Sequence, residues 1–139
     1  MNFIFREKLI RPGLVLQNVY PKVVLIADPQ DTQCRIYARH FDANEVICQM
    51  CSEYHQLHKT IHELDPHLLL LTLTPFEKKI AEVKKITKKY PRLRIVTLSE
   101  GNEFSGLKEL MSLGVSGHIN KGLTRARDVV ELAQSVLNY

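Results

Sequence analysis

The 139-residue sequence lacks any apolar run long enough to cross a membrane, and it contains only three cysteines. A transmembrane helix needs about 20 consecutive apolar residues, so we expect no membrane-spanning segment. An odd number of cysteines without a disulfide framework is typical of the reducing cytoplasm, where we expect the protein to lie. The first residues, MNFIFREKLIRP, carry charges within their apolar part and no small-residue cleavage site, unlike a secretory signal.

The sequence also lacks the motifs of several enzyme and nucleic-acid-binding classes. It contains no glycine-rich phosphate loop, no nucleophilic triad and no aromatic RNA-binding motif, so we expect neither an enzyme nor a cofactor. Basic residues outnumber acidic ones by 19 to 15, and eight of the basic residues lie between Glu77 and Arg94. A solvated helix face is the favoured interpretation of this basic segment, and a patch for nucleic acid or an anionic surface is the alternative.

What the sequence does contain is a regular alternation of apolar runs and helical patterns. Strands are predicted over 22–28, 45–51, 67–73, 93–99 and 117–120. Helices are predicted over 32–41, 55–64, 75–90, 103–113 and 124–137, the last with Thr124 as its N-cap. Five strand–helix units in succession predict one α/β domain over 22–139, built on a doubly wound parallel sheet with helices on both faces. Residues 1–21 precede this domain as an arm.

The third predicted strand, within HLLLLTLTP at 67–75, has four consecutive leucines without polar alternation. Such a strand is expected to be covered on both faces, as in the interior of a parallel sheet. Its end then delivers Thr72 to the edge of the sheet. Thr74, Pro75 and Glu77 follow the pattern of a helix capping box, so we expect a helix to begin almost directly after the strand.

The polar residues at the ends of the predicted strands define a candidate site. In a doubly wound sheet, the pocket lies beyond the carboxyl ends of the strands, where the strand order switches. The residues at those ends are Asp28, Thr72, Ser99 and Lys121. We therefore expect these four side chains to gather at one edge of the sheet.

Three segments around these positions carry a family resemblance. They are LDPHLLLLTL at 64–73, YPRLRIVTLSE at 90–100 and GVSGHINK at 114–121. In this order and spacing they resemble the receiver domains of response regulators, most of all those that precede LuxR-type DNA-binding domains. The resemblance implies a flavodoxin-like fold with strand order 2-1-3-4-5, and a role in two-component signal transduction and transcription regulation.

Two positions depart from the pattern of that family, whose phosphate acceptor is a carboxylate at the end of the third strand. The acceptor position here is Thr72, and the two acids that help to hold Mg²⁺ after the first strand have become Ala27 and Asp28. Ser99 and Lys121 match the residues that contact the phosphoryl group in the family. The resemblance therefore implies a degenerate phosphorylation pocket.

The charges of this pocket argue against metal-assisted phosphotransfer. Asp28 and Lys121 sum to zero, which leaves no charge to hold a divalent cation, and a threonine hydroxyl cannot form an acyl phosphate. We expect no metal, and we expect Asp28 and Lys121 to pair directly instead. For the Thr72 hydroxyl we expect a hydrogen bond to nearby backbone.

A cluster of cysteines and histidines follows the second predicted strand. Cys48 and Cys51 have the CxxC spacing of redox and zinc sites, but residues three apart on a strand point to opposite faces, so core cysteines are expected. His55, His58 and His62 follow at helical spacing. Solvent-exposed histidines are the favoured interpretation, and a zinc site beside Cys51 is the alternative.

His118 occupies the position of the family's switch aromatic, which turns inward on activation. An imidazole at this position could sense pH near neutrality. A surface histidine without a role is the favoured interpretation.

These features predict a pseudo-receiver, a phosphorylation-independent module for regulatory protein–protein interaction or dimerisation. The expected partners are a second copy and other signalling proteins, with DNA reached only through a separate output domain. The last predicted helix has an apolar arc about 160° wide, broader than the roughly 100° that covers a core. We predict a dimer face at the edges of this arc, formed by Val130, Leu132 and Leu137, unless the arm at 1–21 buries it.

An alternative function is a small-molecule sensor. Such a protein would use the vacated phosphorylation pocket, or the surface formed by the fourth helix, the fifth strand and the last helix.

Overall fold

The computed structural model describes residues 21–42, 45–74, 76–100 and 104–138. The strands are β1 (Lys22–Ala27), β2 (Val46–Cys51), β3 (Leu68–Thr72), β4 (Arg94–Ser99) and β5 (Gly117–Asn120). The helices are α3 (Asp31–His40), the short 3-10 helix η1 (Tyr54–Gln56), α4 (Leu57–Leu64), α5 (Phe76–Lys89), α6 (Phe104–Ser112) and α7 (Ala126–Leu137). None of these helices is both long enough and apolar enough to span a membrane. Apart from Pro21, the predicted arm lies outside the described residues.

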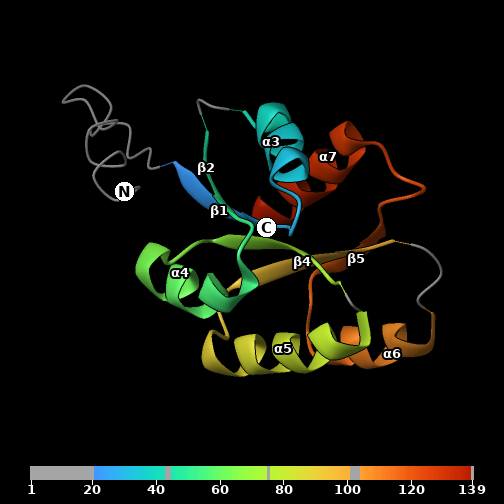
Figure 1. Ribbon diagram of the computed structural model, residues 1–139. Coiled ribbons are helices and arrows are strands. Elements are labelled where there is room, and N and C mark those ends of the chain that lie inside the picture. The colour runs from blue at the N-terminus through green and yellow to red at the C-terminus, as the bar shows by residue number, and fades with distance from the viewer. Residues whose placement is uncertain (1–20, 43–44, 75, 101–103, 139) are drawn as a thin grey trace.

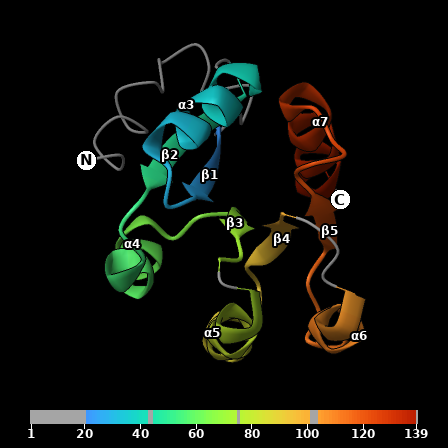
Figure 2. The ribbon, with the colours of Figure 1, turned by 45° about the vertical axis from the view of Figure 1, so that its right-hand side comes forward.

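The strands form one parallel sheet with the order β2-β1-β3-β4-β5. This confirms the predicted doubly wound, flavodoxin-like fold. Helices α3 and α7 lie on one face of the sheet, and α4, α5 and α6 lie on the other (Figures 1 and 2). The chain leaves β1 toward β2 and then crosses back to β3, so the strand order switches between β1 and β3. The carboxyl ends of these two strands are therefore the expected place for a site.

The run of four leucines in β3 is covered on both faces, as predicted. Leu69 and Leu71 belong to the hydrophobic cluster beneath α4, α5 and α6. Leu68 and Leu70 belong to the cluster beneath α3 and α7. All four side chains are fully buried, which explains why the strand has no polar alternation.

The two cysteines of the CxxC spacing point to opposite faces of the sheet, as predicted for strand residues three apart. Cys51 is buried in the cluster beneath α4 and α5, whereas Cys48 packs against the cluster beneath α3. Cys48 and Cys51 are both free thiols.

The start of the last helix differs from the prediction, because Thr124 is not its N-cap. The helix α7 begins at Ala126, and the N-cap position is held by Arg125 without a side-chain capping bond. The turn after β5 uses the intervening residues: the Leu123 amide donates to the Asn120 carbonyl at 3.2 Å, and the Gly122 amide donates to Asn120 Oδ1 at 2.9 Å. Asp128 lies in the first turn of α7, and its Oδ2 accepts a hydrogen bond from Arg125 Nε at 3.1 Å. Its negative charge is favourable there because the start of a helix carries a partial positive charge.

The predicted helix after β3 is present and begins at Phe76, four residues after the strand ends. The capping box proposed for its first turn involves Pro75 and the side chain of Glu77, which lie outside the described residues.

Candidate functional site

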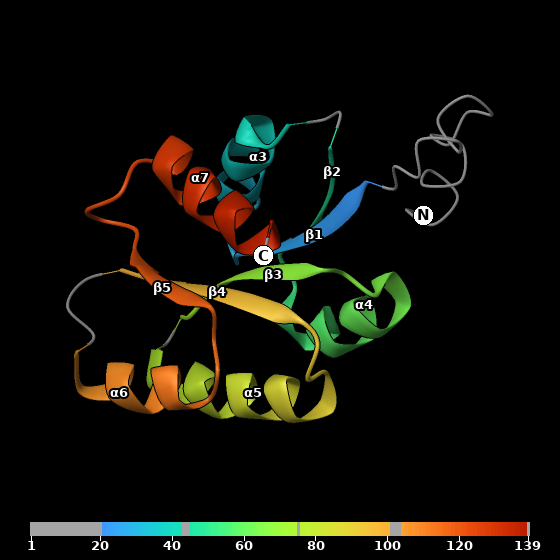
Figure 3. The same ribbon diagram turned by 180° about the vertical axis from the view of Figure 1, so that it is seen from behind.

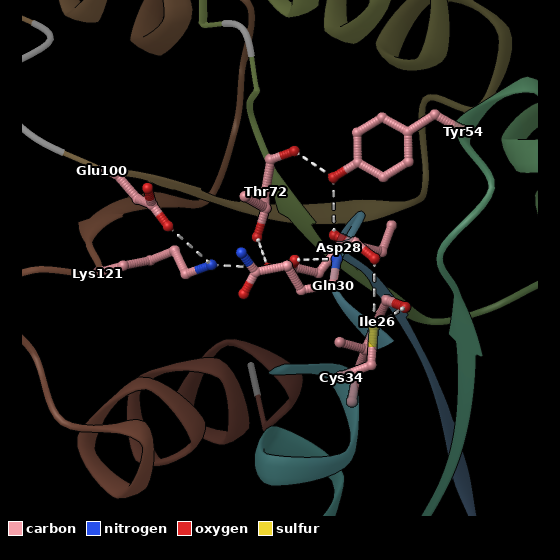
Figure 4. A network of polar contacts seen from close by, with 9 residues as sticks. Ile26, Asp28, Gln30, Cys34, Tyr54, Thr72, Glu100 and Lys121 are labelled. Atoms are coloured by element: carbon pink, nitrogen blue, oxygen red, sulfur yellow. Dashed lines mark hydrogen bonds and ion pairs between the residues drawn. The ribbon is translucent and has the colours of Figure 1, made fainter. Parts of the chain in front are cut away.

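The carboxyl edge of the sheet brings together three of the four predicted site residues. Asp28 follows β1, Thr72 ends β3, and Lys121 follows β5. Ala27 pairs with Leu71 in the register of β1 and β3, so the next residues along, Asp28 and Thr72, lie opposite each other. Figure 4 shows Lys121 reaching toward this pair from the β5 side.

The Asp28 carboxylate is the centre of this polar network. Its Oδ2 accepts hydrogen bonds from Thr72 Oγ1 at 2.6 Å and from Lys121 Nζ at 2.8 Å. Its Oδ1 accepts from the Gln30 backbone amide at 2.8 Å. Both oxygens of the carboxylate are therefore occupied by donors from the protein itself.

Burial makes the pairing of Asp28 and Lys121 energetically important. Asp28 is 1% exposed, and the side chain of Lys121 is 9% exposed. At 2.8 Å and an effective dielectric of 20, their gross attraction is roughly 6 kcal/mol, from which the cost of desolvating both charges is subtracted. Lys121 also lies 3.7 Å from the exposed carboxylate of Glu100. The predicted direct ion pair is confirmed.

The bond of the Thr72 hydroxyl corrects the sequence-based expectation. We expected this hydroxyl to bond to nearby backbone, but it donates to the carboxylate of Asp28, a residue 44 positions away. Thr72 is 2% exposed, so its hydroxyl needs a partner inside the protein, and the register of the two strands places an ionised acceptor beside it.

Tyr54 is a member of the site that the sequence analysis missed. Its hydroxyl contacts the backbone carbonyl oxygens of Ala27, at 3.1 Å, and of Thr72, so it bridges the ends of β1 and β3 (Figure 4). Burial, and secondarily the charge of Asp28, raises the pKa of Tyr54, which keeps the hydroxyl a donor. The Lys79 ammonium lies 4.7 Å from the centre of its ring. A tyrosine soon after a strand is too common a pattern to have revealed this role.

Cys34 lies beneath the same network, from the first turn of α3. Its Sγ lies 3.6 Å from the Asp28 carbonyl oxygen and 3.7 Å from that of Ile26. Burial raises the pKa of this thiol to about 11, with the charge of Asp28 acting in the same direction. Cys34 is therefore a protonated core residue rather than a reactive thiolate.

Ser99, the fourth predicted site residue, is bonded to His118 rather than to Asp28. The ring of His118 lies between two hydroxyls, with Nδ1 2.7 Å from Thr97 Oγ1 and Nε2 2.9 Å from Ser99 Oγ. Burial lowers the pKa of His118, which favours the neutral ring. The interpretation of His118 as a surface histidine needs correction: the ring is half-buried and held by two hydroxyls, because β4 and β5 are adjacent and Thr97 pairs with His118 in their register.

Comparisons with known proteins identify the fold but not a family. No protein-family model matches the sequence, and no curated protein matches it. A response regulator from Thermotoga maritima is similar in structure, with a TM-score of 0.76 and 11% identity over 86% of this chain and 99% of that one. The chain has the fold of a response-regulator receiver domain.

Two further solved structures show the same likeness. An orphan response regulator of H. pylori has a TM-score of 0.75 and 10% identity, over 84% of this chain and 96% of that one. A CheY-like receiver domain protein from Methanospirillum hungatei JF-1 has a TM-score of 0.75 and 15% identity, over 85% of this chain and 94% of that one. At such low sequence identity, the structural similarity shows only that the fold is the same, so the function has to be argued from the site.

The receiver fold raises the question of Mg²⁺, and the residues of this chain do not fit that ion. Magnesium needs near-octahedral oxygen ligands and usually relies on carboxylates. Both oxygens of Asp28 accept hydrogen bonds from the protein, and Lys121 neutralises its charge. Among the described residues, no group of three or more His, Cys, Asp or Glu side chains could hold a metal ion. We therefore assign no step to a metal.

The histidines on the helix after β2 do not gather around Cys51. His58 is paired with Glu82 of α5, and His55 lies 3.6 Å from Glu53. His62 is exposed on α4. Cys51 Sγ lies 3.4 Å from the Glu53 carbonyl oxygen.

The predicted dimer face is narrower than the sequence indicated. Val130 is 1% exposed and Leu137 is 6% exposed, and both belong to the core between α7 and the sheet. The sheet and α3 cover more of the apolar arc than an isolated helix pattern reveals. Leu132 is 51% exposed, so it is the only one of the three that can contact a partner.

Proposed function

We propose that this chain is a pseudo-receiver, a phosphorylation-independent module for regulatory protein–protein interaction in signal transduction. The observation that supports it is the closed network of Asp28, Thr72 and Lys121. The resemblance of its GVSGHINK segment to LuxR-type regulators supports a role in transcription control. DNA would then be reached through a separate output domain.

The acceptor position supports the loss of phosphotransfer. A threonine hydroxyl cannot form the acyl phosphate that a carboxylate forms, and the hydroxyl of Thr72 is already a donor to Asp28. Asp28 itself is 1% exposed and accepts hydrogen bonds at both oxygens, so its carboxylate is not accessible to a phosphodonor. The residues that elsewhere contact a phosphoryl group are occupied too, Lys121 by Asp28 and Ser99 by His118.

The state of the switch position supports a constitutive rather than a switched module. In the receiver family, the aromatic at this position turns inward on activation. His118 already bonds to Thr97 and Ser99 through both ring nitrogens. We infer that the surface around β5 and α7 is held in one arrangement and meets its partners without a phosphorylation signal.

The test is to incubate the protein with acetyl phosphate and Mg²⁺ at neutral pH and to measure its intact mass. A receiver that is known to be phosphorylated serves as the positive control. We expect no added mass in this chain and no change in its melting temperature. A labile adduct of about 80 Da, the mass of one phosphoryl group, would contradict the proposal. Asp28→Asn would then show whether Asp28 had become the acceptor.

A second candidate function, small-molecule sensing, is favoured by a cavity of about 550 Å³ on the β5–α7 surface. It is lined by residues of β4, β5 and α7, including Val96, His118 and Leu132. The volume is in the range of ligand pockets, and the lining is mainly apolar with a few polar groups. A thermal-shift screen with metabolites separates the two functions, because a ligand at 100 times its dissociation constant adds about 2.7 kcal/mol of stability.

A further inference from the structure

A second cavity, of about 520 Å³, lies at the opposite edge of the sheet from Asp28. Its lining includes the first residues of β1 and β4, Lys22 and Arg94, and the segment that follows α5. Asp28 lies six positions after Lys22, which places the two edges about 20 Å apart at the rise of a strand. This cavity, which we call the basic cavity, is therefore distinct from the degenerate phosphorylation pocket.

The lining of the basic cavity is rich in cations. Lys22, Lys89, Arg92 and Arg94 line it, against one carboxylate, Asp65. The Arg94 guanidinium donates to the Val136 carbonyl oxygen, so it helps to hold the end of α7. No ion pair between described residues involves the other three cations.

Helix ends account for only part of this charge. The last residues of α5 and α7 and the C-cap of α4 line the cavity, and each helix end carries roughly half a negative charge. Three such helix ends together with the Asp65 carboxylate contribute a charge of about −2.5, whereas the four cations contribute +4. The cavity keeps a surplus of roughly +1.5, which an anion would neutralise.

The walls indicate a small ligand rather than an extended polyanion. Tyr90, Pro91 and Leu93 supply a less polar side to the same cavity. A volume of about 520 Å³ falls in the range that holds small molecules. Arginine and lysine together suit phosphate oxygens, since a guanidinium binds them in a bidentate manner and an ammonium adds charge.

We propose that the basic cavity binds a phosphorylated small molecule. Its phosphate groups contact Lys22, Lys89 and Arg92, and its less polar part lies against Tyr90 and Pro91. This site is independent of the proposed loss of phosphotransfer, since it uses the other edge of the sheet.

The test uses pyrophosphate, ADP and adenosine as probes at low ionic strength, with binding measured by calorimetry and mapped by amide NMR shifts. We expect saturable binding of ADP and pyrophosphate with dissociation constants below about 1 mM, and no binding of adenosine. Lys89→Gln with Arg92→Gln should weaken binding by about tenfold or more. The matched control is Lys84→Gln with Lys85→Gln, which removes the same charge from exposed positions of α5 outside the cavity.

The pattern across the variants decides the proposal. Shifts confined to residues that line the basic cavity, with the control pair binding within about twofold of wild type, support it. Equal weakening in both double variants would show a general attraction to the basic helix face and overturn it. Shifts centred on Asp28 and Lys121, adenosine binding as tightly as ADP, or no saturation up to the millimolar range would also overturn it.

Discussion

The Thr72 hydroxyl and the Lys121 ammonium donate to the same oxygen of Asp28, at 2.6 Å and 2.8 Å. One donor is neutral and ends β3, and the other is charged and follows β5. Because Asp28 is almost inaccessible to solvent, each donor replaces hydration that the carboxylate has lost. The stability of the domain should therefore depend on both.

Replacing Thr72 tests the neutral donor. Thr72→Val keeps the shape but leaves the carboxylate with one donor fewer, so we expect a loss of about 1–3 kcal/mol in the free energy of unfolding. Thr72→Ser keeps the hydroxyl and should lose clearly less. Urea titration of the three proteins gives the comparison, and equal losses for Val and Ser would show that the hydroxyl contributes little.

Replacing Lys121 tests the charged donor. Lys121→Met leaves a buried, unpaired carboxylate, so we expect a loss of about 3–5 kcal/mol. Asp28→Asn combined with Lys121→Met removes both charges, and its loss should be smaller than the sum of the two single losses by at least about 1 kcal/mol. Additive losses in the double-mutant cycle would mean that the two charges do not interact.

His118 should make stability depend on pH. Burial lowers its pKa below the ordinary value of 6.5, so the unfolded chain takes up this proton more readily than the folded one. The contribution of neutral His118 to the free energy of unfolding is complete above about pH 6.5. It is lost as the pH falls from there toward the pKa that His118 has in the folded state. Urea titrations on either side of this window should show a smaller pH dependence for His118→Gln than for wild type.

The control for His118 is His62→Gln, which changes an exposed imidazole on α4. It should retain the pH dependence of wild type. An equal change in both variants would assign the effect to overall charge rather than to the half-buried ring of His118.

Self-association through α7 should depend on Leu132. The predicted dimer would be constitutive, and Leu132→Glu should shift it to monomer in light scattering at high micromolar concentration, because a charge would be buried in the contact. Leu123→Glu is the matched control, since Leu123 is 84% exposed and lies outside α7. A wild-type monomer, or a dimer that tolerates Leu132→Glu, would end this prediction.

The sheet and the polar residues at its edge could be predicted because each depends on a pattern within a short segment or on a simple sum of charges. The leucine run of β3 marks a strand buried on both faces, and the predicted strand ends together with the balance of charges indicated that Asp28 would pair with Lys121. The order of the strands came from the family resemblance, and the structure has the same order.

Apart from the start of α7, where Arg125 and not Thr124 holds the N-cap position, the errors concern contacts between distant segments. The Thr72–Asp28 bond depends on the register of β1 and β3, and the bonds of His118 to Thr97 and Ser99 depend on the register of β4 and β5. The contact of Tyr54 with the ends of β1 and β3 requires the path of the chain after β2. The burial of Val130 depends on how α7 lies on the sheet. A pattern within one segment carries no information on such positions.

The alternation of side chains in β1, β3 and β4 has a consequence for motion. Residues of these strands enter both hydrophobic clusters in turn, so the two helical layers share one set of strands, as the view from behind illustrates (Figure 3). Opening either layer would expose one side of strands that the other layer still holds, and the two should unfold together as one cooperative unit. We therefore expect a partner that displaces a helix of one layer to affect the packing of the other layer too, because both layers rest on the same strands.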